Sequence, residues 1–202
     1  AGERYKGTLL YASPMHIRLL ASDKTERRFT YLKRVISTST AISSNFCEAF
    51  KKRFSIDVSQ AYGIIEIGLP IINLQKSALH PDAVGHALPA YCVEILSGNF
   101  EVLPANTLGK LAIKGPGMFD GYLSPPQLKA DIVINDWFLT GDLAIKNSDG
   151  LITVKGREKS MINVSGNKVF PEEVEQVILQ HPAVADCKVM GIQHALLGET
   201  VK

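Results

Sequence analysis

The segment spanning residues 137–175 constrains the fold most, because it combines two turns, the positively charged Arg157 and a helix start within a short length of chain. Residues 147–150 (Asn-Ser-Asp-Gly) lie between two apolar runs, which is the pattern of a tight β-hairpin. Gly166 marks a second hairpin-like turn. Pro171 suits the first turn of a helix, where its missing N–H leaves no hydrogen bond unmade. The segment therefore predicts two hairpins followed by a helix.

The net charge of the 202 residues is +2, from 22 Lys and Arg against 20 Asp and Glu, and the composition excludes several classes of protein. No basic block alternates with aromatic residues, so nucleic acid is not an expected partner. The three cysteines form no CxxC pair and fit a reducing compartment better than a disulfide framework. The most apolar run, residues 64–72, is far shorter than a membrane span of roughly 20 residues. We therefore expect a cytoplasmic protein without a transmembrane segment.

Residues 1–78 alternate between helical and strand patterns, with a helix that opens at Pro14 and a short buried strand over residues 32–37, which is typical of an α/β layer. Within this part, a loop of small residues leads to a helix over residues 45–54, and the loop contains Ser39, Thr40 and Ala41. The simpler interpretation is a polar loop that ends in a helix N-cap. The functional interpretation is that the loop offers backbone groups to a flat ligand.

A strand over residues 56–62 carries Tyr62 to its end, where Gly63 permits a tight turn before Glu66. Ligands of α/β sheets bind at such carboxyl ends of strands. Tyr62 can stack on a purine, and Glu66 can bind a hard cation such as Mg²⁺ through oxygen. For an isolated motif, however, a core tyrosine and a surface glutamate are the simpler interpretation.

Residues 79–158 change to short alternating runs separated by turns, such as residues 91–96 and 110–114. Regularly spaced short strands indicate a small barrel or sandwich. After this part, the second hairpin is followed by a helix over residues 171–180 and a strand over residues 186–192. These elements predict the beginning of a small α+β domain.

Three short motifs follow one another along the chain: Tyr-Gly-Ile-Ile-Glu at 62–66, Thr-Gly-Asp at 140–142 and Gly-Arg at 156–157. In this order and spacing they resemble the adenylate-forming (AMP-binding) superfamily of acyl- and aryl-CoA synthetases, peptide-synthetase adenylation domains and luciferases. The resemblance covers nearly the whole chain, and residues 169–175 match CoA synthetases better than peptide-synthetase domains. It implies an incomplete adenylate-forming enzyme fold: an α/β part (1–78), a β-barrel-like part (79–158), and a hinge with the start of a small C-terminal domain (159–202).

The resemblance also assigns roles to individual residues of this chain. It implies that Tyr62 and the loop with Ser39, Thr40 and Ala41 hold the adenine, and that Gly63 is a further cofactor-binding residue. Asp142 would accept hydrogen bonds from both ribose hydroxyls, and Arg157 would donate to the same sugar or to a phosphate. Glu66 would be the catalytic residue that holds Mg²⁺. Lys159 would be the hinge, and the loop around Gly166 would help to line a tunnel for a thiol.

The implied function is part of an ATP-dependent carboxylic acid:CoA ligase that uses ATP, Mg²⁺ and CoA and forms an acyl-adenylate before the thioester. One alternative is an acyl-AMP ligase that loads the thiol of an acyl carrier protein. A second is a catalytically degenerate member, because Ile65 and Asn163 stand where the family has threonine and often lysine. A third is a β-rich binding module unrelated to adenylation. Since the family's phosphate loop and C-terminal lysine have no counterpart here, we expect an internal-to-C-terminal fragment that is inactive alone.

Overall fold

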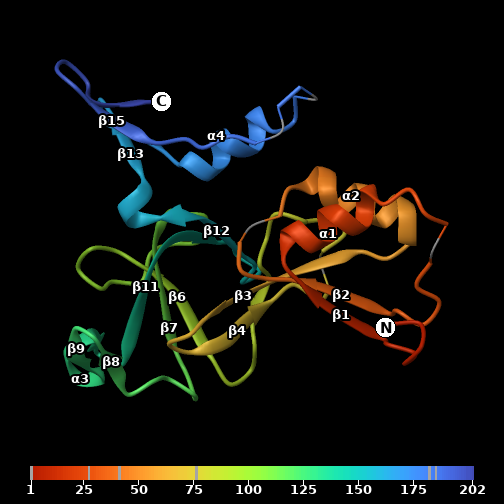
Figure 1. Ribbon diagram of the computed structural model, residues 1–202. Coiled ribbons are helices and arrows are strands. Elements are labelled where there is room, and N and C mark those ends of the chain that lie inside the picture. The colour runs from red at the N-terminus through yellow and green to blue at the C-terminus, as the bar shows by residue number, and fades with distance from the viewer. Residues whose placement is uncertain (1, 27, 41, 76, 182, 185) are drawn as a thin grey trace.

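A computed structural model describes residues 2–26, 28–40, 42–75, 77–181, 183–184 and 186–202 (Figure 1). The N-terminal half forms a five-stranded sheet whose spatial order follows the chain. Its first three strands are parallel and the last two antiparallel: β1 (Leu9–Ala12), β2 (Arg34–Ser37), β3 (Val58–Ile64), β4 (Gly68–Ile72) and β5 (His86–Ala87). The strand predicted before the small-residue loop is therefore present as β2, and β1 was not predicted.

Two helices, α1 (Pro14–Ser22) and α2 (Ser44–Phe54), lie side by side on one face of this sheet (Figure 1). Both helices were predicted, and each buries one apolar stripe. Ile17 of α1 and Phe50 of α2 are fully buried against Val35 and Val58 of the sheet. The packing confirms the predicted α/β layer.

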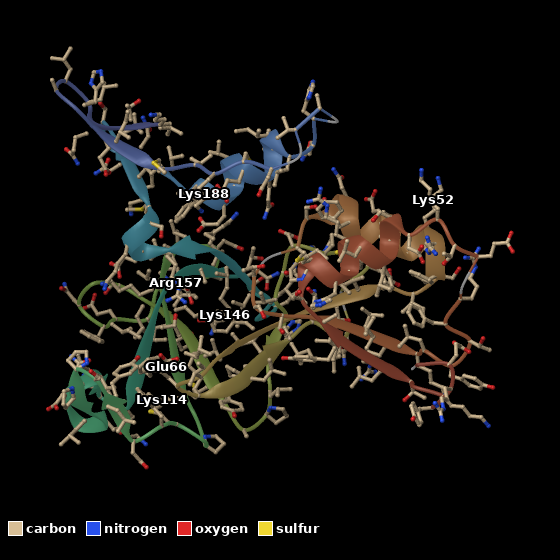
Figure 2. The ribbon with its side chains drawn as sticks, viewed as in Figure 1. Lys52, Glu66, Lys114, Lys146, Arg157 and Lys188 are labelled. Carbon is tan, nitrogen blue, oxygen red and sulfur yellow. The ribbon has the colours of Figure 1, made fainter. Side chains whose placement is uncertain are left out.

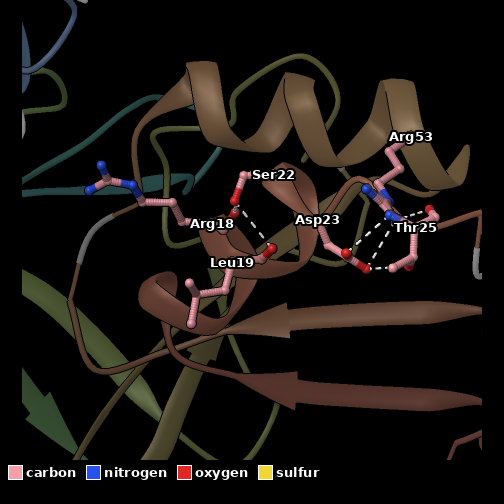
Figure 3. A network of polar contacts seen from close by, with 6 residues as sticks. All are labelled: Arg18, Leu19, Ser22, Asp23, Thr25 and Arg53. Atoms are coloured by element: carbon pink, nitrogen blue, oxygen red, sulfur yellow. Dashed lines mark hydrogen bonds and ion pairs between the residues drawn. The ribbon is translucent and has the colours of Figure 1, made fainter. Parts of the chain in front are cut away.

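A polar network fixes the chain between these two helices. The guanidinium of Arg53 lies 3.2 Å from a carboxylate oxygen of Asp23 and donates to the carbonyl of Thr25 at 2.7 Å (Figure 3). The hydroxyl of Thr25 donates to the same carboxylate at 2.6 Å. The loop after α1 is therefore held against the last turn of α2.

The second sheet is antiparallel and curled, and the order of its main strands is β10-β11-β7-β6, with β12 also paired to β11. The strands are β6 (Cys92–Leu96), β7 (Gly109–Lys114), β10 (Val133–Ile134), β11 (Trp137–Lys146) and β12 (Ile152–Arg157). Residues 147–150 join β11 to β12, which confirms the first predicted hairpin. The side chain of Asn147 accepts from the amides of Asp149 and Leu151 and closes this turn.

A small hairpin and a short helix extend from one end of this sheet (Figure 1). They are β8 (Gly121–Leu123), β9 (Pro126–Leu128) and α3 (Lys129–Ile132). A single core joins the two large sheets, because Ile67 and Ile71 from the β4 region pack with Leu111 of β7 and Ile152 of β12.

The predicted domain boundaries stay predictions. The one at residue 78 falls between β4 and β5.

The C-terminal part begins at a short 3₁₀ turn, η1 (Glu158–Ser160), and lies above β12 in Figure 1. Its sheet has the order β14-β13-β16-β15. The elements are β13 (Ile162–Val164), β14 (Asn167–Val169), α4 (Pro171–Ile178), β15 (Gly191–His194) and β16 (Gly198–Val201). The second predicted hairpin and the helix start at Pro171 are confirmed.

The strand predicted over residues 186–192 is wrong in position, since β15 begins only at Gly191. The amide of Val189 donates instead to the carboxylate of Glu175 on α4 at 2.8 Å, so this backbone donor is used by a side chain rather than by a neighbouring strand. The predicted helix end was also late, because α4 ends at Ile178. No helix in the described part of the chain is long and apolar enough to cross a membrane.

Candidate functional site

A cavity of about 350 Å³ lies between the carboxyl end of β3, the loop after β2 and the hairpin β11–β12. Its volume is within the range of small-molecule sites. The residues that line it come from separate segments of the chain between residues 39 and 176: Ser39, Thr40, Ile42, Ser44, Gln60, Ala61, Tyr62, Gly63, Ile64, Asp82, Val84, Asp142, Thr153, Val154, Lys155, Gly156, Arg157, Glu172, Glu173 and Gln176.

Asp142 places a buried carboxylate in this cavity. Its two carboxylate oxygens are held by different partners: the hydroxyl of Tyr62 donates to Oδ2, and Nε of Arg157 lies 2.9 Å from Oδ1. The residue is only 6% exposed, so both partners are needed to offset the cost of burying its charge. The structure thus brings together three of the residues that the sequence motifs singled out.

The backbone around Asp142 explains why the motif carries a threonine and a glycine. The hydroxyl of Thr140 accepts a hydrogen bond from the Asp142 amide at 3.1 Å and donates to the carbonyl of Leu111 at 3.2 Å, which fixes the backbone at a register shift within β11. Gly141 has φ +80°, a left-handed conformation that glycine adopts without strain. A guanidinium nitrogen of Arg157 lies 3.7 Å from where a Gly141 Cβ would be. This backbone aims the carboxylate into the cavity beneath the arginine.

The phenol of Tyr62 is a donor under all ordinary conditions. Burial raises its pKa well above the ordinary value, and the neighbouring charge of Asp142 and the hydrogen bond to it raise it further. Thr140 and Arg157 have a smaller opposite effect. Tyr62 therefore stays protonated and keeps its hydrogen bond to Asp142.

The loop after β2 supplies one wall of the cavity through Ser39 and Thr40. Ser39 has φ +84°, which is uncommon for a residue with a side chain. Ala41, the third residue predicted in this loop, lies outside the described residues.

Gln60 is a lining residue that the sequence motifs did not reveal. Its side chain accepts the amide of Ile42 at 3.3 Å and donates to the carbonyl of Pro81, and the residue is 2% exposed. It therefore fixes the loop against β3 and against the segment before β5. The sequence offered one indication of this role, because Gln60 carries the one side-chain amide among the residues just before Tyr62.

Gly63 lines the cavity, but its predicted place in a turn is wrong. It lies within β3, and the turn follows at residues 65–67. A Cβ on Gly63 would lie 2.7 Å from the carbonyl oxygen of Gly68 and 2.9 Å from a methyl of Leu69. Glycine is needed here because β4 approaches closely, not because the backbone turns.

Three other predicted residues lie away from the cavity lining. Glu66 is on the turn after β3 and accepts a hydrogen bond from the hydroxyl of Tyr122 at 2.8 Å, on the side of β8 and β9 (Figure 2). Gly166 is in the β13–β14 turn, where its amide donates to Asn163 at 2.8 Å. Lys159 is exposed within η1, where the chain passes to the C-terminal part.

The first turns of α4 form a wall of the cavity that the sequence did not predict. Glu173 pairs with Lys155 of β12 at 3.0 Å. One oxygen of Glu172 is buried without a hydrogen-bond partner among the described residues, close to Gly156. The signal for this wall was present only as the two acids after Pro171, which also suit any helix start.

The arrangement suits a ligand with neighbouring hydroxyl groups. Asp142 offers acceptor positions, Arg157 offers donors, and the loop and β3 offer backbone groups. Among the described residues, no group of three or more His, Cys, Asp or Glu side chains could hold a metal ion. The single carboxylate of Glu66 suits Mg²⁺ only together with water and phosphate oxygens from a ligand.

Comparison with known proteins identifies the family of this chain. The family model of AMP-binding enzymes matches residues 1–123. The chain is 30% identical over 189 residues to the human mitochondrial acyl-coenzyme A synthetase ACSM2A, covering 91% of this chain and 33% of that protein. It is 32% identical over 144 residues to a long-chain-fatty-acid–CoA ligase of Escherichia coli O6:H1, covering 71% of this chain and 26% of that protein.

Solved structures give the same result. ATP-bound MatB from Rhodopseudomonas palustris superposes with a TM-score of 0.87 at 26% identity, over 100% of this chain and 42% of that chain. The o-succinylbenzoate CoA synthetase MenE of Bacillus subtilis, in complex with its acyl-adenylate, shares the fold with a TM-score of 0.89 at 24% identity, over 99% and 41% of the two chains. The chain thus spans about a third of the length of the curated relative ACSM2A. It belongs to the AMP-binding family of adenylate-forming enzymes and is homologous to acyl-CoA synthetases.

Proposed function

We propose that this chain provides the AMP-binding part of an ATP-dependent carboxylic acid:CoA ligase. In the first step a carboxylate oxygen attacks the α-phosphorus of ATP, and the bond to pyrophosphate breaks. In the second step the sulfur of CoA attacks the acyl carbon, AMP leaves, and the thiol proton is released. The relatives named as CoA synthetases and ligases support this reaction class.

The observation that carries the proposal is the carboxylate of Asp142, held in the cavity by Tyr62 and Arg157. A carboxylate fixed in this way can accept both hydroxyls of a ribose, while the guanidinium donates to the sugar or to the α-phosphate. The loop with Ser39 and Thr40 borders the base. Since adenylation depends mainly on positioning and charge neutralisation, these contacts would hold the α-phosphate in place for attack.

Glu66 is the proposed ligand of Mg²⁺ on ATP, and Lys159 is the proposed hinge. One carboxylate is enough for this cation, because Mg²⁺ keeps several waters and takes oxygens from the phosphates of its substrate. When bound, the cation would neutralise charge on the leaving pyrophosphate.

Substitution of Asp142 tests the proposal in the full-length protein, meaning the natural polypeptide that contains these 202 residues. Asp142→Asn should raise the KM for ATP at least tenfold or abolish ATP–pyrophosphate exchange, since hydrogen bonds to a charged acceptor contribute about 1.5–3 kcal/mol. Asp120→Asn, an exposed aspartate away from the cavity, is the matched control. Unchanged exchange in Asp142→Asn would refute the ribose assignment.

The acceptor and the acid need separate measurements. Thioester formation with ATP and CoA alone, without a carrier protein, would favour the CoA ligase over an enzyme that loads a carrier thiol. A panel of carboxylic acids assayed by pyrophosphate release then identifies the substrate class. If no acid gives release from the full-length protein, the degenerate alternative replaces the ligase.

A further inference from the structure

We infer that the hydroxyl of Tyr62, rather than its ring, is the functional group of this residue: it orients Asp142 for the two neighbouring hydroxyls of a ribonucleotide. Tyr62 would thus be a positioning residue that helps the site to distinguish ribose from deoxygenated sugars. The inference rests on the proposed function, because it takes Asp142 as the ribose-binding group.

The carboxylate of Asp142 keeps acceptor positions beside its two partners. A carboxylate can accept about four hydrogen bonds, two on each oxygen. Tyr62 donates one hydrogen bond to Oδ2, and Arg157 forms an ion pair with Oδ1. Among the described residues, at least one position on each oxygen is therefore left, which is the number that two vicinal hydroxyls require. Partners on opposite oxygens also restrict the rotation of the carboxylate.

The two partners of Asp142 differ in their freedom to move. The side chain of Arg157 is 59% exposed, and its other contact, to the carbonyl of Thr140, is long at 3.4 Å. Tyr62 is partly buried on β3, which is paired on both sides by β2 and β4. An aromatic side chain that is partly buried on a paired strand has less conformational freedom than an exposed guanidinium. Tyr62 is therefore the stiffer of the two supports of Asp142.

The contact between Tyr62 and Asp142 also connects distant parts of the fold. Tyr62 and Asp142 are 80 residues apart, on strands of different sheets, and their hydrogen bond joins the two sheets at the cavity. The ring of Tyr62 packs against the core that includes Ile67 and Ile71. The phenol oxygen is thus held by the packing of its ring, and any hydroxyl-specific effect can be separated from that packing by Tyr62→Phe.

The test measures dissociation constants for AMP and for 2′,3′-dideoxy-AMP in the full-length protein. Tyr62→Phe should weaken AMP binding about tenfold and leave dideoxy-AMP binding unchanged, because only AMP uses the oriented carboxylate. Tyr91→Phe, which removes a hydroxyl that contacts the carbonyl of Ile67 at 3.4 Å outside the cavity, is the matched control. In Tyr91→Phe, the ratio of the dissociation constants for AMP and 2′,3′-dideoxy-AMP should equal the ratio in the unmodified protein.

Equal weakening of both nucleotides in Tyr62→Phe would overturn the inference, since the phenol would then act only through the fold. Asp142→Asn in the same assay distinguishes a failure of the role proposed for Tyr62 from a failure of the ribose assignment. If it reduces the preference for AMP but Tyr62→Phe does not, only the role of Tyr62 is wrong. If it leaves the preference unchanged, the ribose assignment itself fails. Should Tyr62→Phe not fold in thermal melts, Tyr62→His, with a flat but shorter side chain, is measured with the same expected loss of preference.

Discussion

Asp142 and Arg157 are register partners on β11 and β12, and Nε of the arginine lies 2.9 Å from Oδ1 of the aspartate. Their exposures differ sharply, with 7% of the Asp142 side chain accessible against 59% of the Arg157 side chain. The anion is therefore fixed in the protein while its cation can move at the mouth of the cavity. A ligand can recruit the arginine without removing the other support of Asp142.

Arg157→Lys should weaken ATP binding about tenfold with little loss of stability. Lysine keeps the charge but lacks the fork that serves Asp142 and a ligand oxygen at once. Lysine also leaves a positive charge beside the buried carboxylate, and the Arg157 side chain is 59% exposed, so the change in the free energy of unfolding should be small, about 0–1 kcal/mol. The KM for ATP and the melting temperature of the full-length protein check both parts. Arg34→Lys, exposed and away from the cavity, is the control, and a KM equal to it would contradict the expectation.

Gly63→Ala should destabilise the protein by about 1–3 kcal/mol, because the added Cβ meets the backbone of β4 at 2.7 Å and β3 and β4 must separate. Gly98→Ala is matched to it, since nothing lies within 4 Å of a Cβ at that turn position. Chemical denaturation of the two variants gives the comparison. A Gly63→Ala protein as stable as Gly98→Ala would show that the strands yield freely.

Ile65→Thr should leave stability within about 0.5 kcal/mol, because the side chain is 97% exposed on the turn after β3. If the missing hydroxyl limits the enzyme, the same change should raise the rate of ATP–pyrophosphate exchange about tenfold. Leu79→Thr, at a residue that is 78% exposed, controls for the loss of an apolar surface group. An unaltered exchange rate would remove Ile65 as the cause of any impairment.

The contact between α4 and the segment before β15 should weaken in acid. Burial raises the pKa of Glu175, but the hydrogen bond from the amide of Val189 and the pairing with Lys188 outweigh it, so the pKa lies below its ordinary value. A depressed pKa means that the stabilisation is complete above the unfolded-state pKa of about 4.3 and is lost as the pH falls through the folded-state value.

Hydrogen exchange at the amide of Val189 gives a local measurement of this effect. Glu175→Gln should speed exchange at neutral pH by about fivefold, since it removes about 1 kcal/mol of charge-assisted bonding to a largely exposed lysine. The difference from the unmodified protein should shrink as the pH falls below about 4. A difference that is constant with pH would exclude Glu175 as the titrating group.

Local features of the chain were predictable. The hairpin at residues 147–150 depends on an Asn-Ser-Asp-Gly turn between two apolar runs, and the start of α4 depends on Pro171; both signals act over a few residues. Family membership was predictable for a related reason, because the short motifs at 62–66, 140–142 and 156–157 can be recognised by their order and spacing along the chain. The strand expected over residues 186–192 failed where a distant side chain, Glu175, took a backbone donor.

The amino-acid sequence by itself determined the α/β layer, a second part made of short strands, and the hairpins. Only the tertiary structure decided that Tyr62 supports Asp142 from another sheet, that Gly63 serves close strand packing, and that Glu66 lies outside the cavity lining. The physical reason is distance along the chain. Local patterns fix turns and periodic faces, whereas contacts between residues tens of positions apart depend on how the sheets pack around a shared core.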